Sequence, residues 1–88
     1  MPKLTLFIQD TCPFCRRALG YIDELKQRDE YKNIDIEVVD ENVEKERADS
    51  YDYYYVPTFY LKDEKLHEGG IYQDEVKALF DDVLKRGE

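Results

Sequence analysis

The two cysteines of the chain lie three residues apart, in the stretch 11–15 with the sequence Thr-Cys-Pro-Phe-Cys. An almost continuous apolar run, residues 4–8, precedes this stretch and is typical of a strand buried on both faces of a sheet. Proline is favoured at the first position of a helix, because the N–H that it lacks would have no partner there. The sequence therefore predicts a strand that leads into Cys12 and a helix that begins at Pro13.

Cys12 then lies at the N-terminal end of the helix, where unpaired N–H groups and the positive end of the helix dipole stabilise a negative charge. We expect its thiol pKa to lie below that of a free cysteine and its thiolate to be the exposed, attacking group. Cys15 follows one turn later on the apolar side of the helix, close enough to form a disulfide with Cys12. Arg16 and Arg17 add positive potential and Asp10 opposes it, and the sequence leaves open which effect prevails.

A metal site is the alternative use of two cysteines at this spacing. The chain adds one histidine, His67, far away in the sequence, which is too few ligands for a closed zinc site. An iron–sulfur cluster shared between two copies would take its further ligands from the partner. We expect a redox pair and no metal, with an iron–sulfur or zinc binding module as the less favoured alternative.

Length, charge and the first residues narrow the class of protein. A chain of 88 residues without a repeat or a linker predicts a single domain over residues 1–88. Its N-terminal apolar run is too short for a signal peptide or a membrane span, so we expect a cytoplasmic protein in a reducing compartment. There, a C-x-x-C pair is catalytic rather than a structural disulfide. The net charge of −8 disfavours nucleic acid and anionic membranes as partners.

The middle of the chain alternates between helix and strand patterns. After the helix, predicted over 13–28, alternating apolar and charged residues over 34–39 predict a second strand, parallel to the first and buried better on one face. Residues 40–50 predict a short charged helix that Asp40 or Asn42 caps, with a solvated outer face. The opposite side carries Val43, Arg47, Ala48 and Tyr51. We expect the tyrosines at 51 and 53–55 to pack one ring face each and to keep their hydroxyls in water.

A hairpin and a last helix complete the chain. Proline within a sheet is confined to a strand start or an edge, so Pro57 places a strand at 56–61. A polar turn leads to a short antiparallel strand at 66–68, and Gly69-Gly70 ends it. The apolar stripe of 73–85 predicts a helix. The predicted order is β-α-β-α-β-β-α, an α/β fold.

The chain resembles a glutaredoxin, within the thioredoxin-fold oxidoreductases, over essentially its whole length. Three stretches carry the resemblance: the C-x-x-C at 12–15, Val56-Pro57-Thr58 at the start of the third strand, and Gly69-Gly70 before the last helix. The resemblance implies a thioredoxin-like fold, with a four-stranded mixed sheet and helices on both faces. It also implies that Pro57 is cis and packs beside Cys12, and that the Val56 backbone pairs with a bound peptide or glutathione.

The activity that the resemblance implies is thiol–disulfide exchange, in which Cys12 attacks, a mixed disulfide forms and Cys15 resolves it. Such an enzyme reduces protein disulfides or glutathione mixed disulfides, and serves electron transport and cell redox homeostasis. Its partners are disulfide-containing proteins or small thiols, with glutathione as a co-substrate and no tightly bound cofactor, and we expect a monomer. The expected substrate-binding residues are Thr11, Pro13, Phe14, Val56, Pro57, Thr58, Gly70, Gln73 and Asp74.

The glutathione site departs from the family pattern. Glutaredoxins usually carry a lysine shortly before the first cysteine, which pairs with a glutathione carboxylate, whereas residues 9–11 are Gln-Asp-Thr in this chain. Ile71 and Tyr72 separate Gly70 from the polar residues that usually follow it directly. Thioredoxins match less well, because they carry a tryptophan before the first cysteine. The alternative function is a thioredoxin-like protein disulfide reductase that a flavin reductase recharges.

Overall fold

The computed structural model describes residues 3–86, which form a four-stranded mixed sheet with helices on both faces. The predicted order β-α-β-α-β-β-α and the α/β class are confirmed. The elements are β1 (Lys3–Ile8), α1 (Pro13–Lys26), β2 (Asp35–Asp40), α2 (Lys45–Asp49), β3 (Thr58–Leu61), β4 (Glu64–Glu68) and α3 (Gln73–Arg86).

The sheet has the strand order β2-β1-β3-β4. β1 and β2 are parallel, with Ile8 opposite Asp40, and β1 pairs antiparallel with β3, with Phe7 opposite Thr58. β3 and β4 form the predicted antiparallel hairpin. This register brings the C-terminal ends of β1 and β2 and the start of β3 to the same end of the sheet. The segment that leads to Cys12 leaves the sheet at that end.

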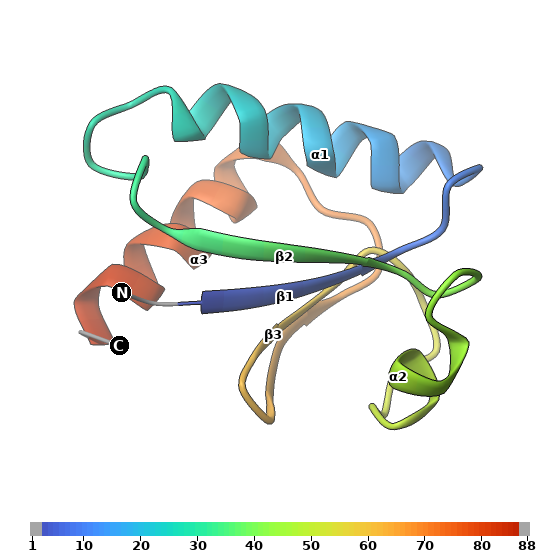
Figure 1. The fold of residues 1–88 in the computed structure, drawn as a ribbon. Helices are drawn as coiled ribbons and strands as arrows, with labels where there is room; N and C mark the ends of the chain where they lie inside the picture. Colours follow the sequence, from blue (N-terminus) through green and yellow to red (C-terminus); the bar gives the residue numbers. More distant parts are fainter. Residues whose placement is uncertain (1–2, 87–88) are drawn as a thin grey trace.

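β1 is buried on both faces along most of its length, as its apolar run predicts. Leu4, Leu6 and Ile8 belong to the core that α1 and α3 cover. Phe7 points to the opposite face, into a second cluster with Ala48 of α2. Figure 1 shows α1 and α2 on opposite sides of the sheet. Strand alternation along β1 therefore supplies both cores of the fold.

The second cluster is aromatic. The Phe7 ring stacks on Tyr53, with ring centroids 5.0 Å apart, and lies against Tyr51 at 4.7 Å. These two tyrosines pack on the domain as predicted. Tyr54 and Tyr55 do not, because 84% and 70% of their surfaces are exposed. Their backbone N–H groups donate to the Glu68 carboxylate, at 2.6 and 3.0 Å, so the loop is fixed while its rings face solvent.

The short helix differs from its prediction at the N-terminal end. It begins at Lys45, after Glu44, and no side-chain hydrogen bond caps it. Asp40 instead closes the preceding turn, where its carboxylate accepts the Asn42 N–H at 2.9 Å and its carbonyl accepts the Val43 N–H at 3.0 Å. Val43 was predicted to face inward and is 78% exposed, because this turn separates it from the helix.

Two strands also differ from the predicted pattern. β3 begins at Thr58 rather than at 56, since its pairing with β1 starts at Phe7. In β2 the side that was predicted to be buried is only partly covered: Val38 is exposed, while Val39 on the other side is fully buried. β2 is at the edge of the sheet, so helix packing reaches only part of it.

Phe7 is the central side chain of the aromatic cluster, and its replacement tests that role. We expect Phe7→Ala to lower the free energy of unfolding by about 3–5 kcal/mol, because it removes a buried ring and leaves a cavity. Phe7→Leu keeps most of the volume and should cost about 1 kcal/mol. Urea unfolding followed by circular dichroism measures both. Val43→Ala is the exposed control, expected within about 0.5 kcal/mol of the wild type. A cost for Phe7→Ala as small as that of the control would contradict a structural role for the ring.

Candidate active site

Cys12 lies at the junction between the β1 end and the start of α1, as predicted. Its backbone is extended, with φ −84° and ψ 119°, and Pro13 follows at the first position of the helix. The Cys12 N–H donates to the Gln9 carbonyl at 3.2 Å, and its carbonyl accepts the Arg16 N–H at 3.1 Å. A tight turn and the first helical hydrogen bond therefore fix the backbone of Cys12 on both sides.

The Cys12 side chain is half-buried, and Cys12 is the N-cap residue of α1, a position where a residue with a side-chain oxygen is usual. Burial opposes the charged form of its thiol. The backbone N–H groups of Cys15 and Phe14, together with the Cys15 thiol, outweigh that effect and lower the pKa of Cys12 below its ordinary value. This lowering has the direction expected for a thiol at a helix N-terminus.

Cys15 is 1% exposed and belongs to the core between α1 and the sheet. Burial raises the pKa of its thiol to about 12; the Gln9 N–H, which donates to the Cys15 sulfur at 3.5 Å, acts against this, and the neighbouring Cys12 adds to it. Both cysteines are free thiols. The predicted contrast between a partly exposed Cys12 and a buried Cys15 is confirmed. The pKa of the Cys12 thiol is lowered and that of the Cys15 thiol is raised.

Glu41 is the charged group near the two sulfurs that sequence reasoning missed. It follows β2, and its N–H donates to the Ile8 carbonyl at 2.9 Å, which places it beside the end of β1. Its carboxylate accepts hydrogen bonds from the Tyr53 hydroxyl, at 2.8 Å, and from the Gln9 side-chain amide. Its negative charge raises the pKa of both cysteines, in Cys12 against the stronger lowering effects. The predicted parallel pairing was the signal that would have found it.

The two arginines that were expected to tune the Cys12 pKa lie on the exposed side of α1. The Arg17 guanidinium carbon is 5.8 Å from the centroid of the Phe14 ring, within the range of a cation–π contact. Their influence on Cys12 remains a prediction. The carboxylate whose influence the structure identifies, Glu41, acts through space from the neighbouring strand.

The segment before β3 lies at the same end of the sheet as Cys12. The Val56–Pro57 bond is cis, as the resemblance implies, and the Pro57 carbonyl accepts the Gly69 N–H at 2.9 Å. Val56 is half-buried and contacts both cores. Thr58 was predicted to contact substrate, but its side chain is fully buried in this structure. Its hydroxyl donates to the Tyr55 carbonyl.

The Gly69-Gly70 turn packs on the C-x-x-C loop. Gly69 has φ 92°, a left-handed conformation that favours glycine. A Cβ on Gly70 would lie 3.3 Å from the Phe14 ring, so the absence of a side chain there gives Phe14 its place. Phe14 itself is 54% exposed. His67 in β4 donates from Nε2 to the Gly70 carbonyl at 3.0 Å.

The remaining predicted contacts lie on either side of this group. Thr11 and Pro13 are exposed and flank Cys12. Gln73 and Asp74 are the first residues of α3, where the Glu75 carboxylate accepts the Tyr72 N–H at 3.0 Å. The substrate-binding role of these residues remains a prediction.

Within residues 3–86, no three histidine, cysteine or acidic side chains converge as a metal site would require. None of the helices in this part of the chain is long and apolar enough to span a membrane.

Sequence comparison finds relatives of the chain among redox proteins. A sequence model of the glutaredoxin family matches residues 4–66. A curated relative from Methanothermobacter marburgensis, named Probable Thioredoxin, is 38% identical over 55 residues, which cover 62% of this chain and 64% of that protein. The chain thus aligns with less than two thirds of the length of that relative.

Solved structures with the same fold include thioredoxins. An oxidised thioredoxin from Plasmodium falciparum superposes with a TM-score of 0.72 at 19% identity, over 91% of this chain and 78% of that one. Oxidised thioredoxin O1 from Arabidopsis thaliana gives 0.69 at 21% identity, over 94% and 78%. A structure described as a malarial protein gives 0.72 at 20% identity, over 93% and 96%. These likenesses establish the thioredoxin-like fold.

The influence of Glu41 on the thiolate is testable by titration. We expect Glu41→Gln to lower the pKa of Cys12 further, because it removes the negative charge that disfavours the thiolate. The pH dependence of alkylation by iodoacetamide measures this pKa, since only the thiolate reacts and the buried Cys15 stays protonated below pH 9. Glu46→Gln, an exposed carboxylate on α2, is the control and should leave the profile unchanged. A Glu41→Gln profile that coincides with the wild type would exclude the proposed influence.

Proposed function

The chain belongs to the glutaredoxin family of thiol–disulfide oxidoreductases, and on this premise we propose that it reduces protein disulfides by dithiol exchange at Cys12 and Cys15. One observation carries the proposal. The two sulfurs lie together at the start of α1, the more exposed one with a lowered pKa and the buried one with a raised pKa. An attacking thiolate and a protonated resolving thiol require this division.

The proposed exchange has two steps. The Cys12 thiolate attacks one sulfur of the substrate disulfide, so that a mixed disulfide forms and the second substrate sulfur leaves as a thiolate that takes up a proton. Cys15 then loses its proton and attacks the Cys12 sulfur, which closes the Cys12–Cys15 disulfide and releases the first substrate sulfur. Two electrons pass to the substrate, and an external dithiol or two external thiols return them to the enzyme.

The raised pKa of Cys15 keeps the resolving thiol inactive until the mixed disulfide exists. In the free enzyme burial raises the pKa of Cys15 most, and the interaction between the two thiols raises it further while it lowers the pKa of Cys12. Once Cys12 is bound in a mixed disulfide, its negative charge is gone, and the loss of the Cys15 proton no longer creates a second charge beside the first. This coupling, together with the burial of Cys15, favours attack by Cys12 before attack by Cys15.

A substrate segment would bind along the edge formed by the Val56–Pro57 segment and the Gly69-Gly70 turn. Val56 precedes the first residue of β3 by two positions, so its backbone lies beyond the sheet ladder. Phe14 rests on Gly70 and exposes about half of its ring beside the cysteines. An extended peptide would add backbone hydrogen bonds at the first of these places and an apolar contact at the second.

We favour a thioredoxin-type flavin reductase over glutathione as the electron donor. Gln9 stands where the family usually has a lysine for the glutathione carboxylate, and its side chain binds the Glu41 carboxylate instead. Glutathione carries a net negative charge, which this carboxylate repels. The name of the relative, Probable Thioredoxin, agrees with this choice. Glutathione and its mixed disulfides are the second candidate, because the family match favours them.

Cysteine variants test the division of roles. We expect Cys12→Ser to reduce the rate of disulfide reduction by about 100-fold or more, because the attacking sulfur is lost. Cys15→Ser should keep the first attack and accumulate the mixed disulfide, which mass spectrometry detects as a covalent adduct. The assay follows one turnover of a disulfide-containing peptide by the reduced protein. Equal rates for the wild type and Cys12→Ser would end the proposal.

The electron donor is tested by two coupled assays on one disulfide substrate. With NADPH and a thioredoxin reductase we expect turnover about tenfold faster than with glutathione and glutathione reductase, because the carboxylate of Glu41 disfavours the tripeptide. Gln9→Lys restores the family's positive charge and should raise the glutathione-dependent rate. Turnover with glutathione that matches or exceeds turnover with the reductase would assign the electrons to glutathione.

A further inference from the structure

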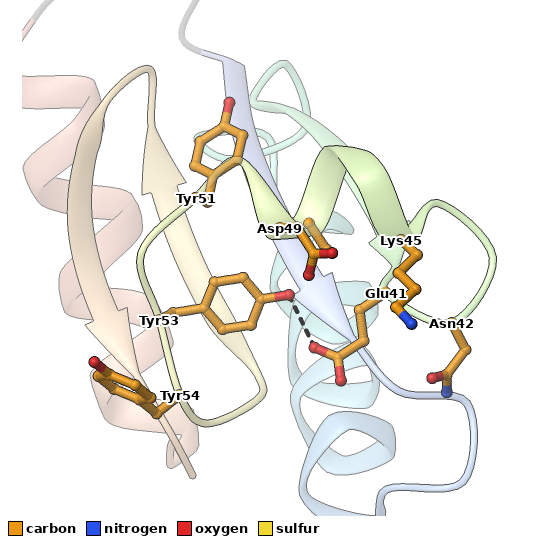
Figure 2. Close-up of a pocket in the computed structure, with 8 residues that line it drawn as sticks. Glu41, Asn42, Lys45, Asp49, Tyr51, Tyr53 and Tyr54 are labelled. Atoms are coloured by element: carbon orange, nitrogen blue, oxygen red, sulfur yellow. Dashed lines mark hydrogen bonds between the residues drawn. The ribbon is translucent and has the colours of Figure 1, made fainter.

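A groove of about 680 Å³ opens on the face of the sheet that α2 covers. Figure 2 shows its two sides, with tyrosines on one and with Glu41, Asn42 and Lys45 on the other. The groove is lined by Glu41, Asn42, Lys45, Ala48, Asp49, Tyr51, Tyr53 and Tyr54. None of these residues was expected to contact substrate, so the groove is a second feature of the surface, distinct from the cysteines.

Glu41 connects this groove to the dithiol. One oxygen of its carboxylate accepts the Tyr53 hydroxyl inside the groove, at 2.8 Å, and the other accepts the Gln9 side-chain amide. The backbone N–H of the same Gln9 donates to the Cys15 sulfur. The Glu41 charge also acts on both cysteines. A group that binds in the groove next to Glu41 therefore lies within electrostatic range of the reacting sulfurs.

The lining suits a cation. Two carboxylates, Glu41 and Asp49, face a single ammonium group, Lys45, so the groove carries a net negative charge. The nearby Arg47 leaves this balance unchanged, because both of its terminal nitrogens donate to the Glu37 carboxylate, at 2.5 and 2.6 Å. Over residues 40–52 the chain has six acidic and two basic side chains. A guanidinium or ammonium group gains here, and an anion is repelled.

The tyrosines give the groove a second, independent property of a binding site. Tyr53 is held in place from both ends, by its stacking on Phe7 and by its hydroxyl bond to Glu41. Tyr54 exposes 84% of its surface at the rim, yet its backbone is fixed by the Glu68 carboxylate. Exposed rings on a fixed backbone are typical of contact surfaces, and their faces attract cations. Little conformational entropy is lost when such a surface binds a partner.

We propose that this groove binds a basic side chain, arginine or lysine, of the protein whose disulfide is reduced. The inference rests on the proposed function and adds the class of substrate to it. The cation pairs with Asp49 and with the side of Glu41 that faces the groove. Its charge also offsets the Glu41 carboxylate beside the dithiol, so a basic substrate favours the Cys12 thiolate that attacks it. Neutral and acidic substrates provide neither effect.

The test compares peptides that share one disulfide and differ in a flanking residue, either arginine or glutamine. We expect the wild type to prefer the arginine peptide by about threefold to fivefold in kcat/KM, the range of a partly exposed ion pair, and to lose the preference at high salt. Asp49→Asn should reduce the preference, and Lys45→Gln should increase it. Glu24→Gln, an exposed carboxylate on α1, is the matched control and should keep the wild-type preference.

The outcomes separate the two proposals. Equal rates for the arginine and glutamine peptides, with both reduced, would overturn the groove proposal and leave the proposed function intact. If neither peptide is reduced, the proposed function fails, and binding then decides the groove by itself. A cysteine-free arginine peptide should shift the backbone amide signals of Asn42, Asp49 and Tyr54 in an NMR titration. The absence of such shifts would overturn the groove proposal independently of catalysis.

Discussion

The arrangement of the site depends on one electrostatic interaction, between the first amides of α1 and the Cys12 sulfur. Those amides have no partner within the helix, and Pro13 at its first position has no N–H that would need one. No side-chain hydrogen bond caps the helix, and the Cys12 sulfur lies near the backbone N–H groups of Phe14 and Cys15, which lower its pKa. The rest of the fold holds the N-terminal end of α1 beyond the C-terminal end of β1, where a large partner can reach the sulfur.

β1 provides that support because it is buried on both faces along most of its length and pairs with β3, whose residues are all buried. One side of the strand packs under α1 and α3 and fixes the position of Cys15, while the other side carries Phe7 and the aromatic cluster under α2. A side-chain substitution in either core therefore affects the same strand, β1, whose C-terminal end leads to Cys12. This explains how a chain of 88 residues holds two sulfurs and a carboxylate in a defined arrangement.

The site combines two opposing influences on its thiolate. The helix amides and the Cys15 thiol favour the charge on Cys12, while partial burial and Glu41 disfavour it. Glu41 is retained in this place by two hydrogen bonds, although its charge weakens the nucleophile of the free enzyme. A carboxylate that a basic partner neutralises on binding reconciles these facts, because the free enzyme is then less reactive than the complex. In the proposed mode of binding, selectivity for the partner and activation of the sulfur depend on the same group.

The sequence by itself determined the order of the elements, the strand-to-helix junction and the different environments of Cys12 and Cys15, because these follow from local patterns of apolar residues and from Pro13. Interactions between distant segments decided the rest. Glu41, which is far from the cysteines in sequence, raises the pKa of both from its position after β2. Tyr53 packs while Tyr54 does not, because only the tertiary arrangement determines which ring meets Phe7. Electrostatic effects and burial depend on distance in space, which the sequence pattern does not give.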